Sequence, residues 1–191
     1  MTTRVQQLAE IGAPGAAIGV IAGAVVGGMS ALAGLPVSWA LVATLTLGVP
    51  LALLGGVYGV LVATGRFKPG TFTPAALFWM VGFPVSRLVH ETTTPVVLGG
   101  SPTPPDDVLT FLVFQALVSL GFAIGFVWLF ERITPPWLVS IKDHNPAAEQ
   151  LYGRYAHHAA VMWEARERRR AHRADRPATA GSGRGKSRRS V

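Results

Sequence analysis

The chain has 191 residues, of which half are hydrophobic and only 14% are charged, and its formal net charge is +7 at pH 7. No Lys, Arg, Asp, Glu or His lies between Ile11 and Val62. A run of that length is too long for a small soluble core, and it can cross a roughly 30 Å hydrocarbon layer twice. The composition therefore excludes a soluble domain and predicts an all-α, polytopic membrane protein.

Four apolar blocks follow a short head, residues 1–10, and predict about four transmembrane helices. The third block is short and carries Pro84, so its helix is expected to kink. Whether that helix crosses the membrane fully or re-enters stays open. The predicted spans are residues 11–35, 39–64, 74–90 and 108–130, with an outer loop at 91–107 and a cytoplasmic segment at 131–176.

The cytoplasmic segment opens with Pro135-Pro136, which predicts a rigid turn directly after the fourth span. Asn145-Pro146 has the form of a helix start, with Asn as the cap and Pro at the first helical position. Apolar residues then recur at helical spacing, which predicts an amphipathic helix over 146–173. Such a helix lies on the membrane surface or packs on a partner protein, and both interpretations stay open.

Two tryptophans of this segment, Trp137 and Trp163, are predicted to anchor the chain at the membrane surface, where amphipathic aromatic rings are enriched. Residues 177–191 are dominated by Gly, Ser and Arg, which predicts a disordered basic tail. A basic tail beside a membrane span is expected to contact anionic lipid head groups. No nucleic-acid-binding motif accompanies the charge, so nucleic acid is not an expected partner.

The basic residues also predict the orientation of the chain. Of the 17 Lys and Arg residues, 13 follow Glu131, and the two loops predicted on the other side contain none. The positive-inside rule then places both termini in the cytoplasm. High Ala, Gly, Val and Arg with little Lys favours a GC-rich bacterial source, and hence a bacterial cytoplasmic membrane. A signal peptide cleaved after Ala31-Leu32-Ala33 is the alternative for the first block, and it would leave the orientation of the rest unchanged.

Glycines at four-residue intervals line the first span: Gly15, Gly19, Gly23 and Gly27. Four residues advance a helix by about 400°, so these positions form a nearly smooth stripe on one face. In lipid, such a stripe lets two helix backbones approach closely. The stripe predicts packing within this chain's own bundle or docking on a partner. Gly121 and Gly125 repeat the pattern in the fourth span.

The third span holds the ionisable residues at membrane depth, Arg87, His90 and Glu91. Their spacing of i, i+3 and i+4 predicts that they share one helix face. Charges inside a membrane are expensive and are functional candidates by default. The competing interpretation is an Arg87–Glu91 ion pair that reaches the outer surface, with His90 as its neighbour.

Other chemistry finds little support in the sequence. Cysteine is absent, which removes disulfides, thiolate metal sites and Cys nucleophiles. The adjacent His157 and His158 point about 100° apart on a helix and make a poor chelate. No phosphate-binding loop, metalloprotease motif or serine-hydrolase elbow is present. We therefore expect no catalytic residues, no metal and no cofactor bound by this chain.

The span layout, the composition and the Arg-rich tail resemble those of the small accessory membrane subunits of actinobacterial respiratory supercomplexes of the cytochrome bcc–aa3 type. The resemblance implies a role in assembly or stability beside other integral membrane subunits, in the electron-transport chain. The sequence accordingly predicts a non-catalytic accessory subunit. The alternatives are a small oligomeric transporter or channel with Arg87, His90 and Glu91 along its path, and a membrane enzyme with His90 and Glu91 as acid and base.

Overall fold

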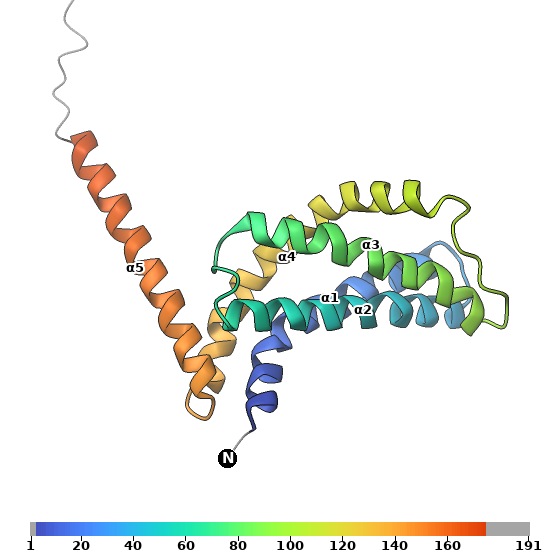
Figure 1. The fold of residues 1–191 in the computed structure, drawn as a ribbon, viewed down its shortest axis with the longest axis horizontal. Coiled ribbons are helices and arrows are strands. Elements are labelled where there is room, and N and C mark those ends of the chain that lie inside the picture. Colours follow the sequence, from blue (N-terminus) through green and yellow to red (C-terminus); the bar gives the residue numbers. More distant parts are fainter. Residues whose placement is uncertain (1–2, 175–191) are drawn as a thin grey trace, which may run out of the picture. The chain divides into compact units, whose positions relative to one another are not determined.

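The computed structural model describes residues 3–174, and the regular structure of this part of the chain is entirely helical. The described residues up to Arg154 form one compact unit, and those from Tyr155 belong to a second. The predicted tail, residues 177–191, lies outside the described residues. The helices are α1 (Arg4–Leu32), α2 (Val37–Ala63), α3 (Phe72–Val97), α4 (Val108–Ile141) and α5 (Pro146–Ala174) (Figure 1).

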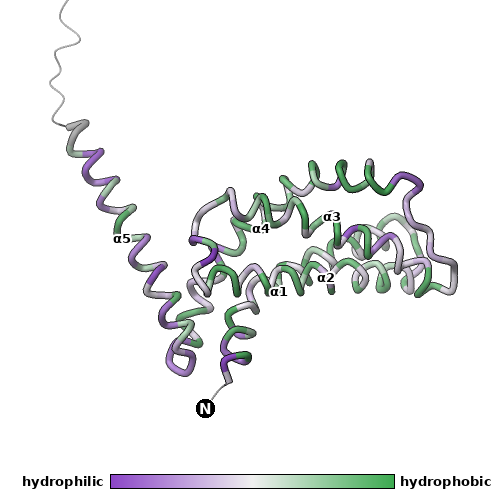
Figure 2. The backbone as a smooth tube through the Cα atoms, in the orientation of Figure 1, coloured by the Kyte–Doolittle hydropathy of each residue, from purple (hydrophilic) through white to green (hydrophobic). Residues whose placement is uncertain are grey.

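The first four helices are long and apolar enough to cross a membrane. Even α3, the shortest of them at 26 residues, has a length of about 39 Å at 1.5 Å per residue, more than the hydrocarbon thickness of a bilayer. Hydrophobic residues predominate along α1 to α4, whereas polar residues are frequent along α5 (Figure 2). The chain is an all-α, multi-pass membrane protein, as its composition predicts.

Two predicted helix ends are wrong, and both errors concern proline. The predicted outer loop begins at Glu91, but α3 continues through Pro95 to Val97. The predicted turn at Pro135-Pro136 is absent, because α4 continues through both prolines to Ile141. In α4, burial of apolar side chains beyond the two prolines offsets the lost backbone hydrogen bonds: Leu138 is fully buried and Ile141 nearly so.

The predicted start of α5 is confirmed. Asn145 is fully buried, and its side-chain oxygen accepts hydrogen bonds from the backbone N–H groups of Ala147 and Ala148, both at 3.1 Å. This is the bonding of a helix N-cap. Pro146 follows as the first helical residue, where its missing N–H costs nothing.

Aromatic side chains form the core between α2, α3 and α4. Tyr58 of α2 meets Phe126 and Phe130 of α4 edge to face, with ring centroids 5.1 Å apart in both pairs. Trp79 of α3 packs on Phe126 at 4.6 Å. These four side chains are at most 2% exposed. Aromatic pairs at such distances contribute about 0.5–1.5 kcal/mol beyond area burial, so this cluster fixes how the three helices pack.

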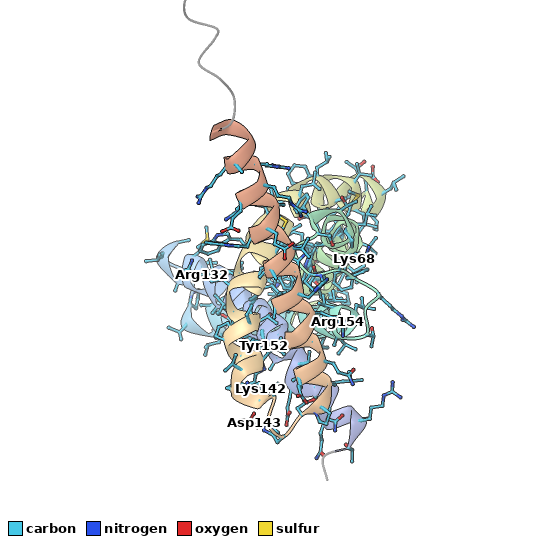
Figure 3. All side chains as sticks on the ribbon, turned by 90° about the vertical axis from the view of Figure 1, so that its left-hand side faces the viewer. Lys68, Arg132, Lys142, Asp143, Tyr152 and Arg154 are labelled. Atoms are coloured by element: carbon cyan, nitrogen blue, oxygen red, sulfur yellow. The ribbon has the colours of Figure 1, made fainter. Side chains whose placement is uncertain are left out.

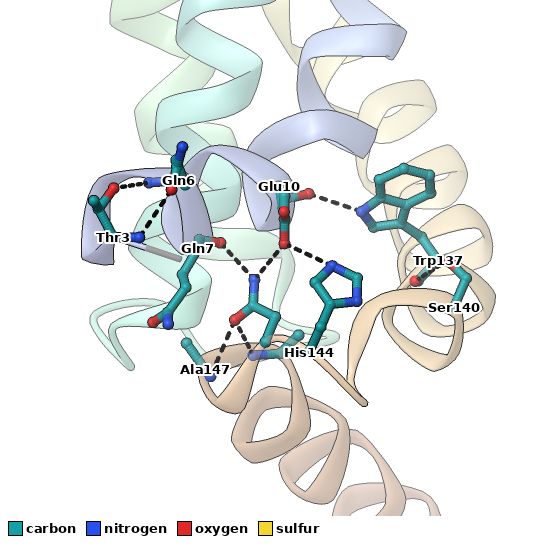
Figure 4. A network of polar contacts seen from close by, with 10 residues as sticks. Thr3, Gln6, Gln7, Glu10, Trp137, Ser140, His144 and Ala147 are labelled. Carbon is teal, nitrogen blue, oxygen red and sulfur yellow. Dashed lines mark hydrogen bonds and ion pairs between the residues drawn. The ribbon is translucent and has the colours of Figure 1, made fainter. Parts of the chain in front are cut away.

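Polar contacts join the start of α1 to the end of α4. The indole N–H of Trp137 donates to the carbonyl oxygen of Glu10 at 2.7 Å (Figure 4). The Asn145 side-chain amide donates to the Gln7 carbonyl oxygen and to the Glu10 carboxylate, both at 2.9 Å. His144 lies 3.3 Å from the same carboxylate. We call this bundle end the basic end, since the basic residues Lys68, Arg132, Lys142 and Arg154 lie there (Figure 3). Arg4 lines a cavity together with Arg154 at the same end.

Candidate functional site

Arg87 and Glu91 form an ion pair on α3. The Arg87 Nη2 atom donates to the Glu91 Oε1 atom at the i, i+4 spacing of the helix. Their side chains are 22% and 39% exposed, so both are partly buried within the bundle. The pairing leaves no net charge from these two residues, which lowers the cost of placing them at membrane depth.

His90 lies in a separate network that crosses from α3 to α2. Its Nδ1 atom is 2.8 Å from the hydroxyl oxygen of Thr46 and 3.3 Å from that of Thr94. The two hydroxyl oxygens are 2.8 Å apart, and Thr46 also lies within 2.9 Å of the Val42 carbonyl oxygen. His90 and Thr94 are buried.

Two arrangements of hydrogens satisfy these atoms, because the Thr46 hydroxyl can donate either to the Val42 carbonyl oxygen or to the His90 Nδ1 atom. We assign the first of them. The Thr46 hydroxyl donates to Val42, and its two lone pairs accept from the Thr94 hydroxyl and from the His90 Nδ1–H. This assignment leaves the neutral His90 ring with an unprotonated Nε2. The network therefore fixes the ring orientation, as hydrogen bonds to one ring nitrogen commonly do.

The predicted cluster of Arg87, His90 and Glu91 is divided between two different surroundings. Arg87 lines a groove with side chains of α1 and α4, whereas His90 packs against the hydroxyls of α2 and α3. Sequence analysis did not identify Thr46 or Thr94 as partners of His90. The position of Thr94 could have indicated it, because Thr94 lies one turn after His90 on the same helix face. Thr46 is a weaker indication, as a polar residue in a span that is otherwise almost entirely apolar.

Gln115 and Ser119 lie one turn apart in the fourth span, and this spacing of two polar residues predicts bonds to a neighbouring helix. For Ser119 this is wrong, because its hydroxyl donates to the Ala116 carbonyl oxygen of its own helix at 2.6 Å. Serine hydroxyls in apolar helices often bond to the preceding turn in this way. Gln115 is buried and lines the same groove as Arg87.

The groove has a volume of about 620 Å³ and opens between α1 and α4, with shorter contributions from α2 and α3. Its walls are apolar except near Arg87 and Gln115. We call it the α1–α4 groove, and its lining includes Ile21, Val25, Phe114, Val118, Gly125 and Leu129.

The predicted glycine stripe of α1 packs inside the chain. A methyl group at Gly15 would overlap the Gly55 carbonyl, and one at Gly19 would overlap the α2 backbone at Ala52. Gly23 meets Gly48 in the same way, and Gly27 meets Thr44. The stripe therefore joins α1 to α2, and these four glycines are buried and do not form an exposed docking face.

Gly121 and Gly125 behave differently from the α1 stripe. Neither has an atom of the described chain within 4 Å of an added methyl group, and both are exposed. Gly125 forms part of the wall of the α1–α4 groove. Of the two predicted glycine patterns, the α4 pair is therefore the exposed one.

The predicted surface anchors also differ from each other. The Trp137 indole N–H is bonded within the bundle to Glu10, so this side chain joins two helices. Trp163 is 60% exposed on α5. Ala159 and Met162, apolar residues of the same helix, are also exposed. Among the described residues, no group of three His, Asp or Glu side chains is placed to hold a metal ion.

The fold and this site define the chain as a multi-pass helical membrane protein with a polar network inside its bundle. Comparison with models of protein families, with curated proteins and with solved structures gave no match.

Proposed function

We propose that the chain is a non-catalytic subunit of a multi-subunit membrane complex, docked on a transmembrane helix of another subunit through the α1–α4 groove. The observation that carries this proposal is the unfilled groove beside the exposed glycines of α4. Of the most apolar stretch of α4, 17% is buried within the chain, against 28% in α1 and α2 and 33% in α3. The helix with the least internal burial thus borders the groove.

Close helix packing at glycines, which this docking requires, already occurs within the chain. Helices in lipid associate through close packing at small residues, because apolar side chains gain little by leaving one apolar surrounding for another. In the α1–α2 pair, glycines of both helices meet backbone to backbone. Gly121 and Gly125 on α4 offer the same small surface, one helical turn apart, to a helix from outside the chain.

The orientation and setting belong to the same proposal. The positive-inside rule places the basic end in the cytoplasm, with both termini there, in a bacterial cytoplasmic membrane. A respiratory supercomplex is the assembly to test first, because the layout and composition resemble those of its accessory subunits. In such a complex this chain stabilises or assembles its neighbours, and the neighbours hold the cofactors.

The test compares two glycine substitutions in native membranes. Gly125→Leu places a branched side chain on the wall of the groove, whereas Gly28→Leu does so at an exposed α1 glycine with open space around it and outside the groove. After mild detergent extraction, the size and composition of the assembly are read by native electrophoresis and mass spectrometry. We expect wild type and Gly28→Leu to co-migrate with a large complex and Gly125→Leu to be released. Extraction of the wild type as a lone monomer or homo-oligomer contradicts the proposal.

A second candidate function, a small transporter or channel, is favoured by one observation. Arg87 lines the α1–α4 groove and is neutralised by Glu91, an arrangement in which a passing ion could compete for either partner. This function predicts that Glu91→Gln abolishes flux in proteoliposomes while the protein still folds. The subunit function predicts that Glu91→Gln leaves the assembled complex intact. Flux that is unchanged by both Arg87→Ala and Glu91→Gln eliminates the transporter.

A further inference from the structure

A polar cavity of about 620 Å³ opens at the basic end, within the compact unit that ends at Arg154. Three helices contribute to it: the first turns of α1, the last residues of α2 and the first turns of α5. Its lining carries two guanidinium groups and two side-chain amides but no carboxylate. The residues that matter here are Arg4, Gln7, Thr64, Gln150 and Arg154.

A second cavity of similar size at the basic end differs in charge, because carboxylates line it. That cavity, about 600 Å³, is lined by Lys142 together with the carboxylates of Asp143 and Glu149. The Lys142 ammonium group also lies over the Tyr152 ring, 5.5 Å from its centroid (Figure 3). Of these two cavities, the one lined by Arg4 and Arg154 carries positive charge without a carboxylate.

Arg154 is held in place by the end of α2. Its guanidinium donates to the Val62 carbonyl oxygen at 3.2 Å and to the Ala63 carbonyl oxygen. Carbonyls at the end of a helix lack partners within the helix, so these bonds satisfy them. A guanidinium has five N–H donors, and the bonds to α2 use only part of them. Arg154 is thus fixed before any ligand arrives, which lowers the entropy cost of binding.

Arg4 belongs to the part of the lining that α1 contributes. The Thr3 hydroxyl accepts from the Gln6 backbone N–H at 3.3 Å, and the Gln6 side chain accepts from the Thr3 N–H at 2.9 Å (Figure 4). This capping box starts α1 at Arg4 and holds its first turn. Gln7 also lines the cavity. Its backbone carbonyl oxygen accepts a hydrogen bond from the Asn145 side-chain amide. Two arginines from separate helices therefore face one cavity on a fixed framework.

We propose that this cavity binds a phosphate group. Guanidinium groups recognise phosphate oxygens through paired, charge-assisted hydrogen bonds, and a neutral amide such as that of Gln150 supplies further donors. The cavity lies where the apolar α2 ends, which is the depth of lipid head groups for a spanning helix. An anionic phospholipid head group and a soluble phosphate share this chemistry.

The test uses the purified full-length chain in a neutral detergent. Phosphatidylglycerol, phosphatidylcholine or inorganic phosphate is added, and binding is measured by native mass spectrometry and by the shift in melting temperature. Arg4→Gln removes one guanidinium. Gln150→Glu adds a carboxylate to the lining while leaving the Arg154 contacts with α2 in place. Lys142→Gln is the matched control, because it removes the same charge from the second cavity.

We expect phosphatidylglycerol to bind and to raise the melting temperature of wild type and of Lys142→Gln. Binding should be about tenfold weaker in Arg4→Gln and in Gln150→Glu, the effect of losing or opposing one charge-assisted contact. A response to inorganic phosphate with the same variant pattern supports the site with a soluble ligand. Equal binding of phosphatidylglycerol and phosphatidylcholine without a phosphate response overturns it. Equal weakening in all three variants also overturns it, since the effect then follows total charge.

Discussion

The indole N–H of Trp137 in α4 donates to the carbonyl oxygen of Glu10 in α1 over 2.7 Å. Glu10 has this carbonyl to offer because Pro14 lies four residues later within the same helix and has no N–H to donate. Figure 1 shows the first turns of α1 bent away from the remainder of the helix. The proline thus creates an acceptor, and the tryptophan of another helix occupies it.

This relationship predicts a double-mutant cycle. Trp137→Phe should lower the free energy of unfolding by about 1 kcal/mol, because the Glu10 carbonyl loses its donor. In a Pro14→Ala background the new backbone N–H bonds to that carbonyl, so the same Trp137→Phe change should cost less. The measurement is thermal unfolding of the purified protein in detergent. Additive effects of the two substitutions contradict the assignment, and Trp163→Phe, at an exposed site on α5, is the neutral control.

The glycine contacts predict opposite effects at two positions of α1. Gly15→Ala forces a methyl group onto the Gly55 backbone, which cannot move aside as a side chain can. We expect a loss of about 1–3 kcal/mol in stability, the range for overpacking. Gly28→Ala meets open space and should be neutral or stabilising, by up to about 1 kcal/mol, through helix propensity.

Thermal unfolding of the two variants in detergent separates them directly. Equal stability of Gly15→Ala and Gly28→Ala contradicts the α1–α2 packing. The result also bears on assembly, because disruption at Gly19 or Gly23 would act through this chain's own helix pair. Release of such a variant from a complex is therefore no measure of a direct contact with a partner.

Much of the fold follows from the pattern of apolar residues, and the errors lie where tertiary packing decides. Four apolar blocks, three of them without a charge, predict four helices because each must satisfy its backbone within the bilayer. Pro135-Pro136 predicts a break from local chemistry alone. The structure continues α4 because the residues beyond, Leu138 and Ile141, are buried in the bundle. The local sequence alone does not predict the burial of these two residues.

The candidate site divides in the same way. The Arg87–Glu91 pair follows from spacing on one helix, since i and i+4 side chains are neighbours. The His90–Thr46 contact joins residues on different helices, and its geometry depends on how α2 packs on α3. The glycine stripe of α1 predicts close packing, yet a stripe alone does not identify its partner helix. Here that partner is α2.

The His90 network predicts a specific response to substitution of Thr46. Thr46→Val removes the hydroxyl that accepts from both His90 and Thr94, and it should lower stability by about 1 kcal/mol. Thr46→Ser retains the hydroxyl and should remain close to wild type. Nitrogen-15 chemical shifts of the His90 ring should show an Nδ1–H tautomer in wild type and a changed tautomer distribution in Thr46→Val. Identical ring shifts in the three proteins contradict the network.

Asp107, directly before α4, predicts a pH dependence at the end of the bundle opposite the basic end. Its carboxylate accepts from the hydroxyl and from the backbone N–H of Thr110, the latter at 3.0 Å. These bonds, the hydroxyl first, lower the pKa of Asp107 below its ordinary value of 3.8, because they favour the ionised form. The folded-state pKa thus lies below the unfolded one. The stabilisation of the α4 start is complete above the unfolded value and is lost as the pH falls through the folded value.

Hydrogen exchange at the first turn of α4, corrected for the intrinsic pH dependence of exchange, follows this loss. We expect protection of the Thr110 amide to fall on acidification below the ordinary carboxyl range in wild type. Asp107→Asn keeps a side-chain oxygen for the same bonds but does not titrate, so its protection should be independent of pH over that range. Asp107→Ala should lack the protection at every pH. A midpoint at or above the ordinary pKa in wild type contradicts the cap, because it means that the bonds to Thr110 do not favour the ionised carboxylate.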